Sequence, residues 1–156
     1  MSTPLPSFRL ARADELRAVT DLAKRSKRHW GYSDAFMAAL DDELTFRQAD
    51  LDDERTRVEV LEVEGALIGA VRMRRRTELA YLEDLWIDPV AIGHGYGRIG
   101  FARACQIGRE WGKGIVELEA DPYAVPFYLH VGCEHVAMSP VTSVPGRSVP
   151  VMRYSL

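Results

Sequence analysis

The chain has 156 residues, of which 47% are hydrophobic and 28% charged, and its formal net charge is −3. This length and composition predict one domain over residues 1–156, and the slightly acidic charge argues against nucleic-acid binding. No stretch approaches the length of a membrane span. Cys105 and Cys133 are too few for a disulfide framework and lack metal-ligand spacing, so we expect no metal and a reduced, cytoplasmic compartment.

The first third of the chain carries one strand signal and two helix signals. Residues 7–12 alternate between apolar and polar side chains, as a strand does. Asp14 then offers an N-cap for a helix with apolar residues at helical spacing, and Ser33 caps a second helix through about Leu44. The polar residues 48–56 are expected to be irregular.

Three strands are predicted next, at residues 57–63, 66–74 and 79–87. Pro89 stops the third, because proline cannot donate to a strand ladder. Arg72 and Arg74 alternate with Val71 and Met73, which is typical of a half-exposed strand whose arginines face water.

The second half of the chain continues with a glycine-rich loop, which opens a helix to about Trp111. A strand at residues 115–120 follows, and Pro122 begins a short helix to about His130. Two strands, residues 133–138 and 149–154, complete the chain. The order β-α-α-β-β-β-α-β-α-β-β predicts a mixed α/β fold, mostly antiparallel early and with one crossover.

The loop that contains Gly93, Gly95, Gly97 and Gly100 carries the main functional signal. Glycines let backbone N–H groups approach a phosphate closely, and a helix start adds unpaired N–H groups with a partial positive charge. A strand followed by this loop and a helix therefore predicts a pyrophosphate site. The alternative is a flexible connection whose glycines only pack the helix.

The same loop also matches the dinucleotide pattern G-x-G-x-x-G, and Glu119 lies near the spacing of a ribose-binding acid. In a Rossmann unit the first glycine follows the strand directly, whereas here seven residues separate Ile87 from Gly95. Too few residues follow Asp121 for further βαβ units. A dinucleotide-binding protein is therefore the weaker hypothesis, and a P-loop is excluded because no Lys-Ser or Lys-Thr follows the glycines.

Residues 85–97 resemble the cofactor motif of the GNAT superfamily of acetyl-CoA-dependent N-acetyltransferases, Arg/Gln-x-x-Gly-x-Gly/Ala. Gly95 and Gly97 match that motif. Ile92 stands where the family has Arg or Gln, which removes one side chain but leaves the backbone amides.

A second segment, residues 121–133, resembles the family's Asn-x-x-Ala-x-x-Phe-Tyr-x-x-x-Gly-Phe. Asp121 replaces the Asn and Cys133 the final Phe. Together the two segments and the order of elements cover residues 8–154. The resemblance implies a central mixed, mostly antiparallel sheet of six to seven strands, splayed at the cofactor site and flanked by about four helices.

The resemblance further implies direct transfer of an acetyl group from acetyl-CoA to a primary amine of a small molecule or a protein. No metal, nucleic acid or membrane is implied, and homodimers are common in the family. Strand main-chain groups would pair with pantetheine, and the loop would hold the pyrophosphate. The implied cofactor-binding residues are Leu85, Trp86, Ile87, Ile92, Gly93, His94, Gly95, Tyr96, Gly97, Arg98, Asp121 and Tyr128.

Tyr128 is also the candidate general acid. By resemblance, its hydroxyl would protonate the departing CoA sulfur. The ordinary pKa of a phenol, about 10, suits this task against about 8.5 for a thiol. The alternative is a core aromatic beside Phe127.

Glu83 is the candidate general base, with Asp84 as the alternative. Adjacent strand residues face opposite sides, so only one is expected to point toward the substrate, and Glu83 shares parity with Leu85. A local bulge would change that answer. Glu117, Glu119 or a water molecule are further alternatives.

His29, Trp30 and Tyr32, between the first two helices, are the candidate acceptor-site residues, because this segment borders the acceptor in the family. The alternative is a hydrophobic plug that closes the sheet. A second functional hypothesis is an acetyl-CoA-binding regulatory module without catalysis, which the departure at Ile92 and the unassigned base suggest.

Overall fold

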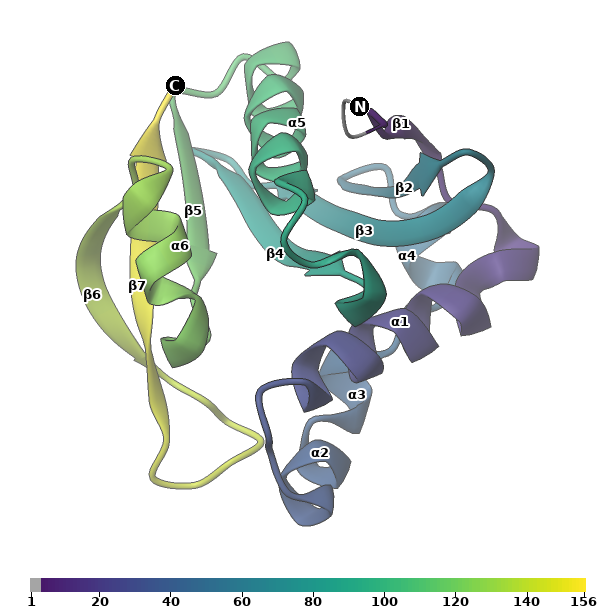
Figure 1. The fold of residues 1–156 in the computed structure, drawn as a ribbon. Helices are drawn as coiled ribbons and strands as arrows, with labels where there is room; N and C mark the ends of the chain where they lie inside the picture. The colour runs from purple at the N-terminus through teal and green to yellow at the C-terminus, as the bar shows by residue number, and fades with distance from the viewer. Residues whose placement is uncertain (1–3) are drawn as a thin grey trace.

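The computed structural model describes residues 4–156 and contains one seven-stranded sheet with helices on both faces (Figure 1). The sheet order is β1-β2-β3-β4-β5-β7-β6, and only the β4–β5 pair is parallel. The strands are β1 (Ser7–Leu10), β2 (Thr56–Val63), β3 (Ala66–Arg75), β4 (Ala80–Ile87), β5 (Ile115–Glu119), β6 (Glu134–Pro140) and β7 (Ser148–Ser155). The prediction of a mostly antiparallel mixed sheet is confirmed, and one parallel pair leaves no room for the repeated βαβ units of a dinucleotide fold.

Six α-helices occur in residues 4–156, against about four predicted. They are α1 (Leu16–Arg28), α2 (Asp34–Ala39), α3 (Asp41–Leu44), α4 (Gln48–Asp52), α5 (Tyr96–Glu110) and α6 (Val125–His130), with 3₁₀ turns at Ala13–Glu15, Pro89–Ala91 and Pro122–Ala124. None of the helices in this described part combines the length and apolar character that crossing a membrane requires.

The two extra helices come from two wrong predictions. The helix that Ser33 caps breaks at Leu40, whose φ of −96° and ψ of 4° leave the helical region, and this separates α2 from α3. The segment expected to be irregular forms α4, where the Arg47 N–H donates to the Asp50 carboxylate at 2.9 Å. Asp50 in turn binds the guanidinium of Arg72, so a contact distant in sequence stabilises a helix of low intrinsic propensity.

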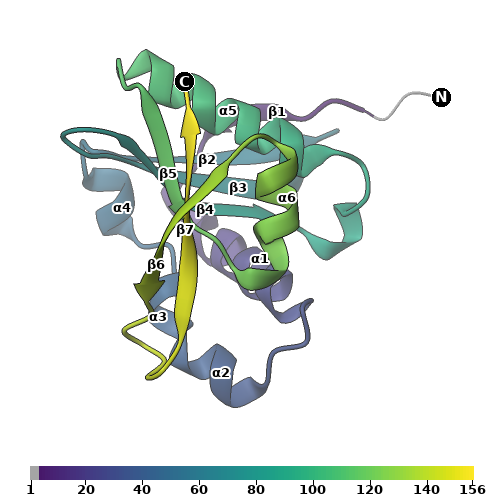
Figure 2. The ribbon, with the colours of Figure 1, turned by 90° about the vertical axis from the view of Figure 1, so that its left-hand side faces the viewer.

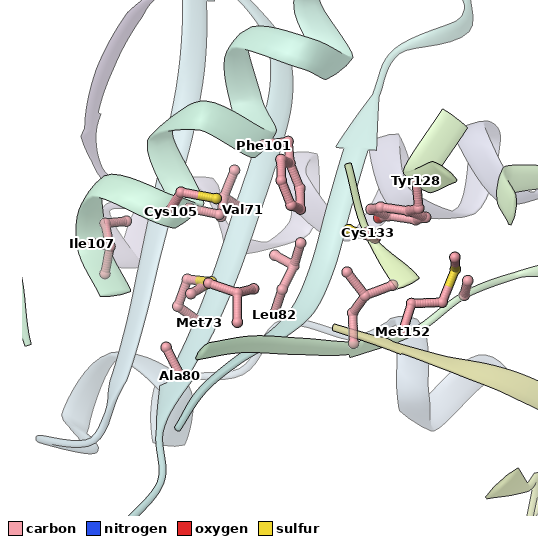
Figure 3. Close-up of a cluster of buried hydrophobic side chains, with 14 of the residues drawn as sticks. Val71, Met73, Ala80, Leu82, Phe101, Cys105, Ile107, Tyr128, Cys133 and Met152 are labelled. Atoms are coloured by element: carbon pink, nitrogen blue, oxygen red, sulfur yellow. The ribbon is translucent and has the colours of Figure 1, made fainter. Parts of the chain in front are cut away.

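Strands β2 and β3 are buried on both faces of the sheet, because neighbouring residues of these strands face different helices. On one face Val60 and Ala70 pack against α1, and on the other Leu61 and Val71 pack beneath α5. Figure 3 shows the α5 face, where side chains from the helix and from the strands point toward one another. Figure 2 shows α6 beside the C-terminal strands on the same side as α5.

Arg72 is therefore not a solvent-facing strand residue, and that expectation is wrong. Its side chain is only 3% exposed, because α3, α4 and the residues between them cover this end of β3. Its guanidinium lies 4.1 Å from the centre of the Phe46 ring. The alternation of arginine with apolar residues thus reflects two buried faces of different chemistry.

Strands β4 and β5 pair over a short distance and then separate (Figure 1). Their parallel register joins only Ala80, Tyr81 and Leu82 to Val116, Glu117 and Leu118. Residues 84–87 of β4 keep their partners in β3 but have none in β5. The predicted splay is thus present and opens toward the carboxyl ends of both strands.

Gly69 provides a test of how tightly β3 approaches β4. A Cβ at Gly69 would lie 2.7 Å from the backbone oxygen of Trp86, closer than real contacts allow. Gly69→Ala is therefore expected to lower the free energy of unfolding by about 1–3 kcal/mol, measured by urea denaturation. Gly114→Ala is the matched control, because nothing lies within 4 Å of its Cβ position. Equal stability of the two variants would contradict the close approach.

Candidate active site

A cavity of about 940 Å³ lies where β4 and β5 separate. Its walls come from the end of β4, the loop before α5, the segment that enters α6, the end of α1, α3, and residues 139–149 around the β6–β7 connection. The predicted site residues that line it are Trp30, Glu83, Asp84, Leu85, Trp86, Ile87, Ile92, Gly93, Gly95, Tyr96, Gly97, Arg98, Asp121 and Tyr128. His29, Tyr32 and His94 are not among its lining residues.

The glycine loop presents backbone N–H groups to this cavity. Gly93 and Gly95 adopt φ values of 93° and 80°, which side chains with a Cβ rarely tolerate, and Gly95 is the N-cap of α5. The first turn of α5 has N–H groups without intrahelical partners, and the helix dipole favours an anion there. Arg98 adds a cationic side chain, 2.6 Å from the His130 ring nitrogen Nε2. The loop can therefore hold a phosphate group.

The end of β4 offers a main-chain edge along the same cavity. Leu85, Trp86 and Ile87 pair with β3 on one side and have no strand partner on the β5 side within residues 4–156. Exposed N–H and C=O groups of such an edge can bind an extended ligand as a further strand would. The edge and the loop thus line the same cavity.

A β-bulge places both candidate bases on the same side of the sheet. The register pairs Arg72 with Asp84 but Met73 with Leu82, so Glu83 has no partner across the ladder. Both carboxylates approach the Nε atom of Arg72, Asp84 at 2.6 Å and Glu83 at 3.7 Å. The expectation that only one of them faces the cavity is therefore wrong, because the extra residue interrupts the alternation.

The two carboxylates differ in their surroundings. Asp84 is 6% exposed, and it accepts hydrogen bonds from Arg72 at one oxygen and from the Trp86 indole nitrogen, 2.9 Å away, at the other. Burial raises the pKa of Asp84, and the Arg72 guanidinium opposes that shift. Glu83 is exposed, and one of its oxygens accepts a hydrogen bond from the Nε of Arg74. Glu83 therefore keeps an oxygen for a ligand, whereas both oxygens of Asp84 are committed.

Tyr128 lines the cavity and is 8% exposed. Its ring packs edge-on against Phe101 and Phe127, with centroids 5.9 Å and 5.1 Å away, and lies beside Cys133 in Figure 3. Burial raises the pKa of the Tyr128 hydroxyl well above its usual range. The phenol is thus held protonated, and it is both a core residue and a cavity residue.

Asp121 joins three segments at the cavity wall. Its carboxylate accepts hydrogen bonds from Lys27 Nζ at 2.5 Å and from the Tyr32 hydroxyl at 2.8 Å. It also caps the turn before α6 through the Tyr123 N–H at 2.9 Å. Burial opposes ionisation of Asp121, but the Lys27 ammonium holds its pKa below the ordinary value. Arg147, on the β6–β7 connection, approaches to 3.8 Å.

The three predicted acceptor residues differ in their exposure and in their position relative to the cavity. Trp30 is 40% exposed and stacks on Tyr123, with centroids 5.4 Å apart and planes 6° from parallel. Tyr32 is half-buried, and burial together with Asp121 raises its pKa to about 12, so it acts as a structural donor. His29 is exposed outside the cavity. The chain places only Trp30 of these three on the cavity surface.

Neither Cys105 nor Cys133 lines this cavity. Among residues 4–156, no group of three or more His, Cys, Asp or Glu side chains is arranged to hold a metal ion. Burial raises the pKa of Cys105 to about 11 and that of Cys133 to about 12, so both thiols stay protonated at neutral pH.

The sequence matches the model of the Acetyltransferase (GNAT) family over residues 16–133, and no curated protein sequence matches the chain. Three solved structures illustrate the similarity in fold. The PaiA N-acetyltransferase of Thermoplasma acidophilum, solved with coenzyme A, is 14% identical, with 97% of this chain and 99% of that chain covered and a TM-score of 0.77. A GCN5-related N-acetyltransferase of Rhodopseudomonas palustris is 16% identical, with 100% and 99% covered and a TM-score of 0.79. YncA of Salmonella typhimurium, solved with acetyl-CoA, is 17% identical, with 96% and 93% covered and a TM-score of 0.66.

The family match spans both segments that line the cavity, the loop before α5 and the segment that enters α6. Similarity at these levels of identity supports the overall fold. The match over residues 16–133 supports membership of the family. The chain belongs to the Acetyltransferase (GNAT) family.

Proposed function

We propose that this chain is an acetyl-CoA-dependent N-acetyltransferase that transfers the acetyl group directly to a primary amine. One observation carries the proposal: the phosphate-binding loop, the unpaired edge of β4 and the Tyr128 ring all line one cavity. The structures of the Thermoplasma and Salmonella proteins, which hold coenzyme A and acetyl-CoA, support the choice of co-substrate. The cytoplasmic location, the single domain over residues 1–156 and a homodimer stay predictions.

The cavity residues fit acetyl-CoA, although two of them differ from the residues in the family's motifs. Residues 93–98 would bind the pyrophosphate through backbone N–H groups, and residues 85–87 would pair with pantetheine. Ile92 is 47% exposed and offers no hydrogen bond where the family has Arg or Gln. Asp121 has its carboxylate committed to Lys27 and Tyr32, so we assign it the role of fixing the wall.

The transfer needs two proton movements. As the amine nitrogen bonds to the thioester carbon and the carbon–sulfur bond breaks, Glu83 accepts a proton from the amine, directly or through water. Tyr128 donates its proton to the leaving sulfur. Asp84 and Arg72 hold the bulge that presents Glu83, and neither needs to exchange a proton.

Binding of acetyl-CoA is the first test. Isothermal titration is expected to show saturable binding of acetyl-CoA, whereas NADH, which a dinucleotide site would take, is expected not to bind. Thiol release is expected to depend on an added primary amine. Absence of any acetyl-CoA binding would contradict the proposal. Binding of acetyl-CoA without turnover across a panel of amines would favour the alternative, a regulatory module without catalysis.

Tyr128→Phe tests the general acid. Because Phe keeps the ring packing, acetyl-CoA affinity is expected to stay while kcat falls about a hundredfold or more. Tyr154→Phe is the matched control, since its ring also packs edge-on against Phe101, at 5.5 Å, but does not line the cavity. Unchanged kcat in the Tyr128 variant would remove this hydroxyl from the reaction.

Paired substitutions distinguish the two carboxylates. Glu83→Gln is expected to lower kcat about a hundredfold, with the remaining rate rising with pH as the free amine becomes more abundant. Asp84→Asn is expected mainly to reduce thermal stability, because Arg72 loses a buried counter-charge. A larger loss of kcat in a folded Asp84→Asn protein than in Glu83→Gln would reverse the assignment.

A further inference from the structure

The two strands that separate at the cavity are followed by the same kind of turn. Asp88 precedes a proline after β4, and Asp121 precedes a proline after β5, with φ of −56° at both aspartates and ψ of 134° and 137°. One oxygen of each carboxylate accepts a hydrogen bond from the backbone N–H two residues on, that of Val90 at 3.3 Å and that of Tyr123 at 2.9 Å. Each carboxylate keeps its second oxygen for another partner.

Both second oxygens bind a cation from the last turns of α1. The Arg25 guanidinium donates to Asp88 at 2.7 Å, and the Lys27 ammonium donates to Asp121 at 2.5 Å. Residues two apart on a helix point in directions about 200° apart, so one side of α1 faces the end of β4 and the other faces the turn after β5. We call these two ion pairs the bridge.

Helix α1 is anchored to the sheet independently of the bridge. Val19 and Ala23 are fully buried in the cluster that contains Ala70 of β3, and Trp86 of β4 packs against the same cluster. The Lys27 side chain is only 11% exposed, so it has little freedom to leave its partner. The helix therefore connects the turn after β5 to the β3–β4 part of the sheet.

The sheet itself does not hold the two strand ends at a fixed separation, because direct pairing of β4 with β5 stops before their last residues. On the α5 face, a contact between Arg98 and His130 also crosses the gap, at 2.6 Å, but both of these side chains are exposed. Lys27 and Asp121 are 11% and 9% exposed. Water and salt screen a buried ion pair less than an exposed contact, so this half of the bridge is the better shielded connection.

The charge of Asp121 is a feature of this chain, because the motif that the segment resembles has Asn there. An Asn can cap the turn in the same way, since its side-chain oxygen accepts a hydrogen bond, but it carries no charge. Asp121 adds a buried negative charge, and Lys27 is the nearest cation that compensates it. The motif alone therefore does not account for the ion pair.

We propose that α1 sets the width of the gap between β4 and β5, with Arg25 and Lys27 as positioning residues that hold the two strand ends. The inference rests on the proposed acetyl-CoA site, because the pantetheine segment would lie in this gap. A bridge of fixed span keeps the gap at its binding width before the co-substrate arrives, and such pre-organisation reduces the ordering that binding requires. Neither residue takes part in a proton transfer.

Lys27→Met tests the bridge through acetyl-CoA affinity. The released gap is expected to spend less time at its binding width, which raises the Kd for acetyl-CoA about tenfold. Lys24→Met is the matched control, because Lys24 lies on the same helix and pairs at 2.6 Å with Asp41 of α3 rather than with a strand end. Isothermal titration measures both variants, and an unchanged Kd in Lys27→Met would overturn the proposal.

A double variant separates positioning from stability. Lys27→Met leaves the Asp121 carboxylate buried without its closest cation, and this is expected to lower Tm. Adding Asp121→Asn removes that charge, so the double variant is expected to recover much of the lost Tm while its Kd for acetyl-CoA stays raised. Recovery of both quantities would mean that the pair only stabilises the fold, and it would overturn the proposal.

Arg25→Met tests the other side of the gap, and its side chain is 53% exposed, so its removal is expected to leave the fold intact. Because the loss of either pair frees the gap, the rise in Kd for Arg25→Met/Lys27→Met is expected to be smaller than the product of the two single effects. Independent contributions to binding would instead multiply, which would contradict a shared bridge.

The gap can also be measured without acetyl-CoA. Val90→Cys and Leu129→Cys place spin labels at exposed positions, one after β4 and one on α6, and the two native cysteines are only 4% exposed and are expected to stay unlabelled. The distance distribution from electron–electron double resonance is expected to broaden with Lys27→Met and to stay narrow with Lys24→Met. An unchanged distribution would overturn the proposal. If acetyl-CoA does not bind the wild-type protein, the proposed function fails, and this measurement still decides whether the bridge fixes the gap.

Discussion

The separation of β4 from β5 is the constraint on which the rest of the site depends. Parallel strands normally continue their ladder, and here the ladder ends after Leu82 and Leu118. The unpaired edge must be satisfied by solvent or by a ligand, because buried main-chain groups rarely go without partners. The loop before α5 and the segment before α6 leave from the two separated ends. The backbone amides of residues 93–98 and Tyr128 therefore come to opposite sides of one gap.

A buried ion pair between Arg72 and Asp84 accompanies the bulge at Glu83. Arg72 and Asp84 face each other across β3 and β4 inside the fold, and Asp50 and two backbone carbonyls complete the guanidinium's partners. Such a buried pair gains little net stability relative to apolar residues, but removal of one member leaves an uncompensated charge. Its effect here is local and geometric, since it fixes the strand where the ladder skips a residue and turns Glu83 toward the cavity.

The sequence predicted the strands, the loop and Tyr128 because each depends on local pattern. Alternation marks strands, glycines mark the left-handed turns at positions 93 and 95, and the motif places Tyr128 on a short helix. Arg72 could not be assigned in this way, because its burial comes from α3 and α4, which pack on it from a distant part of the chain. The parity argument for Glu83 failed for a related reason: a bulge is a property of two paired strands, which one strand's pattern does not contain.

The rest of the cavity shows the same limit more sharply, and the limit has a physical consequence. Its walls meet through contacts such as Lys27 with Asp121 and Glu43 with Ser143, which are 94 and 100 residues apart in the chain. The glycine loop before α5, by contrast, needs only consecutive backbone groups. The backbone arrangement of residues 93–98 can therefore persist through extensive change elsewhere, while the opposite walls shift whenever α2, α3 or residues 141–147 lose one such contact. Fold similarity at 14–17% identity is consequently compatible with cavity walls of different chemistry.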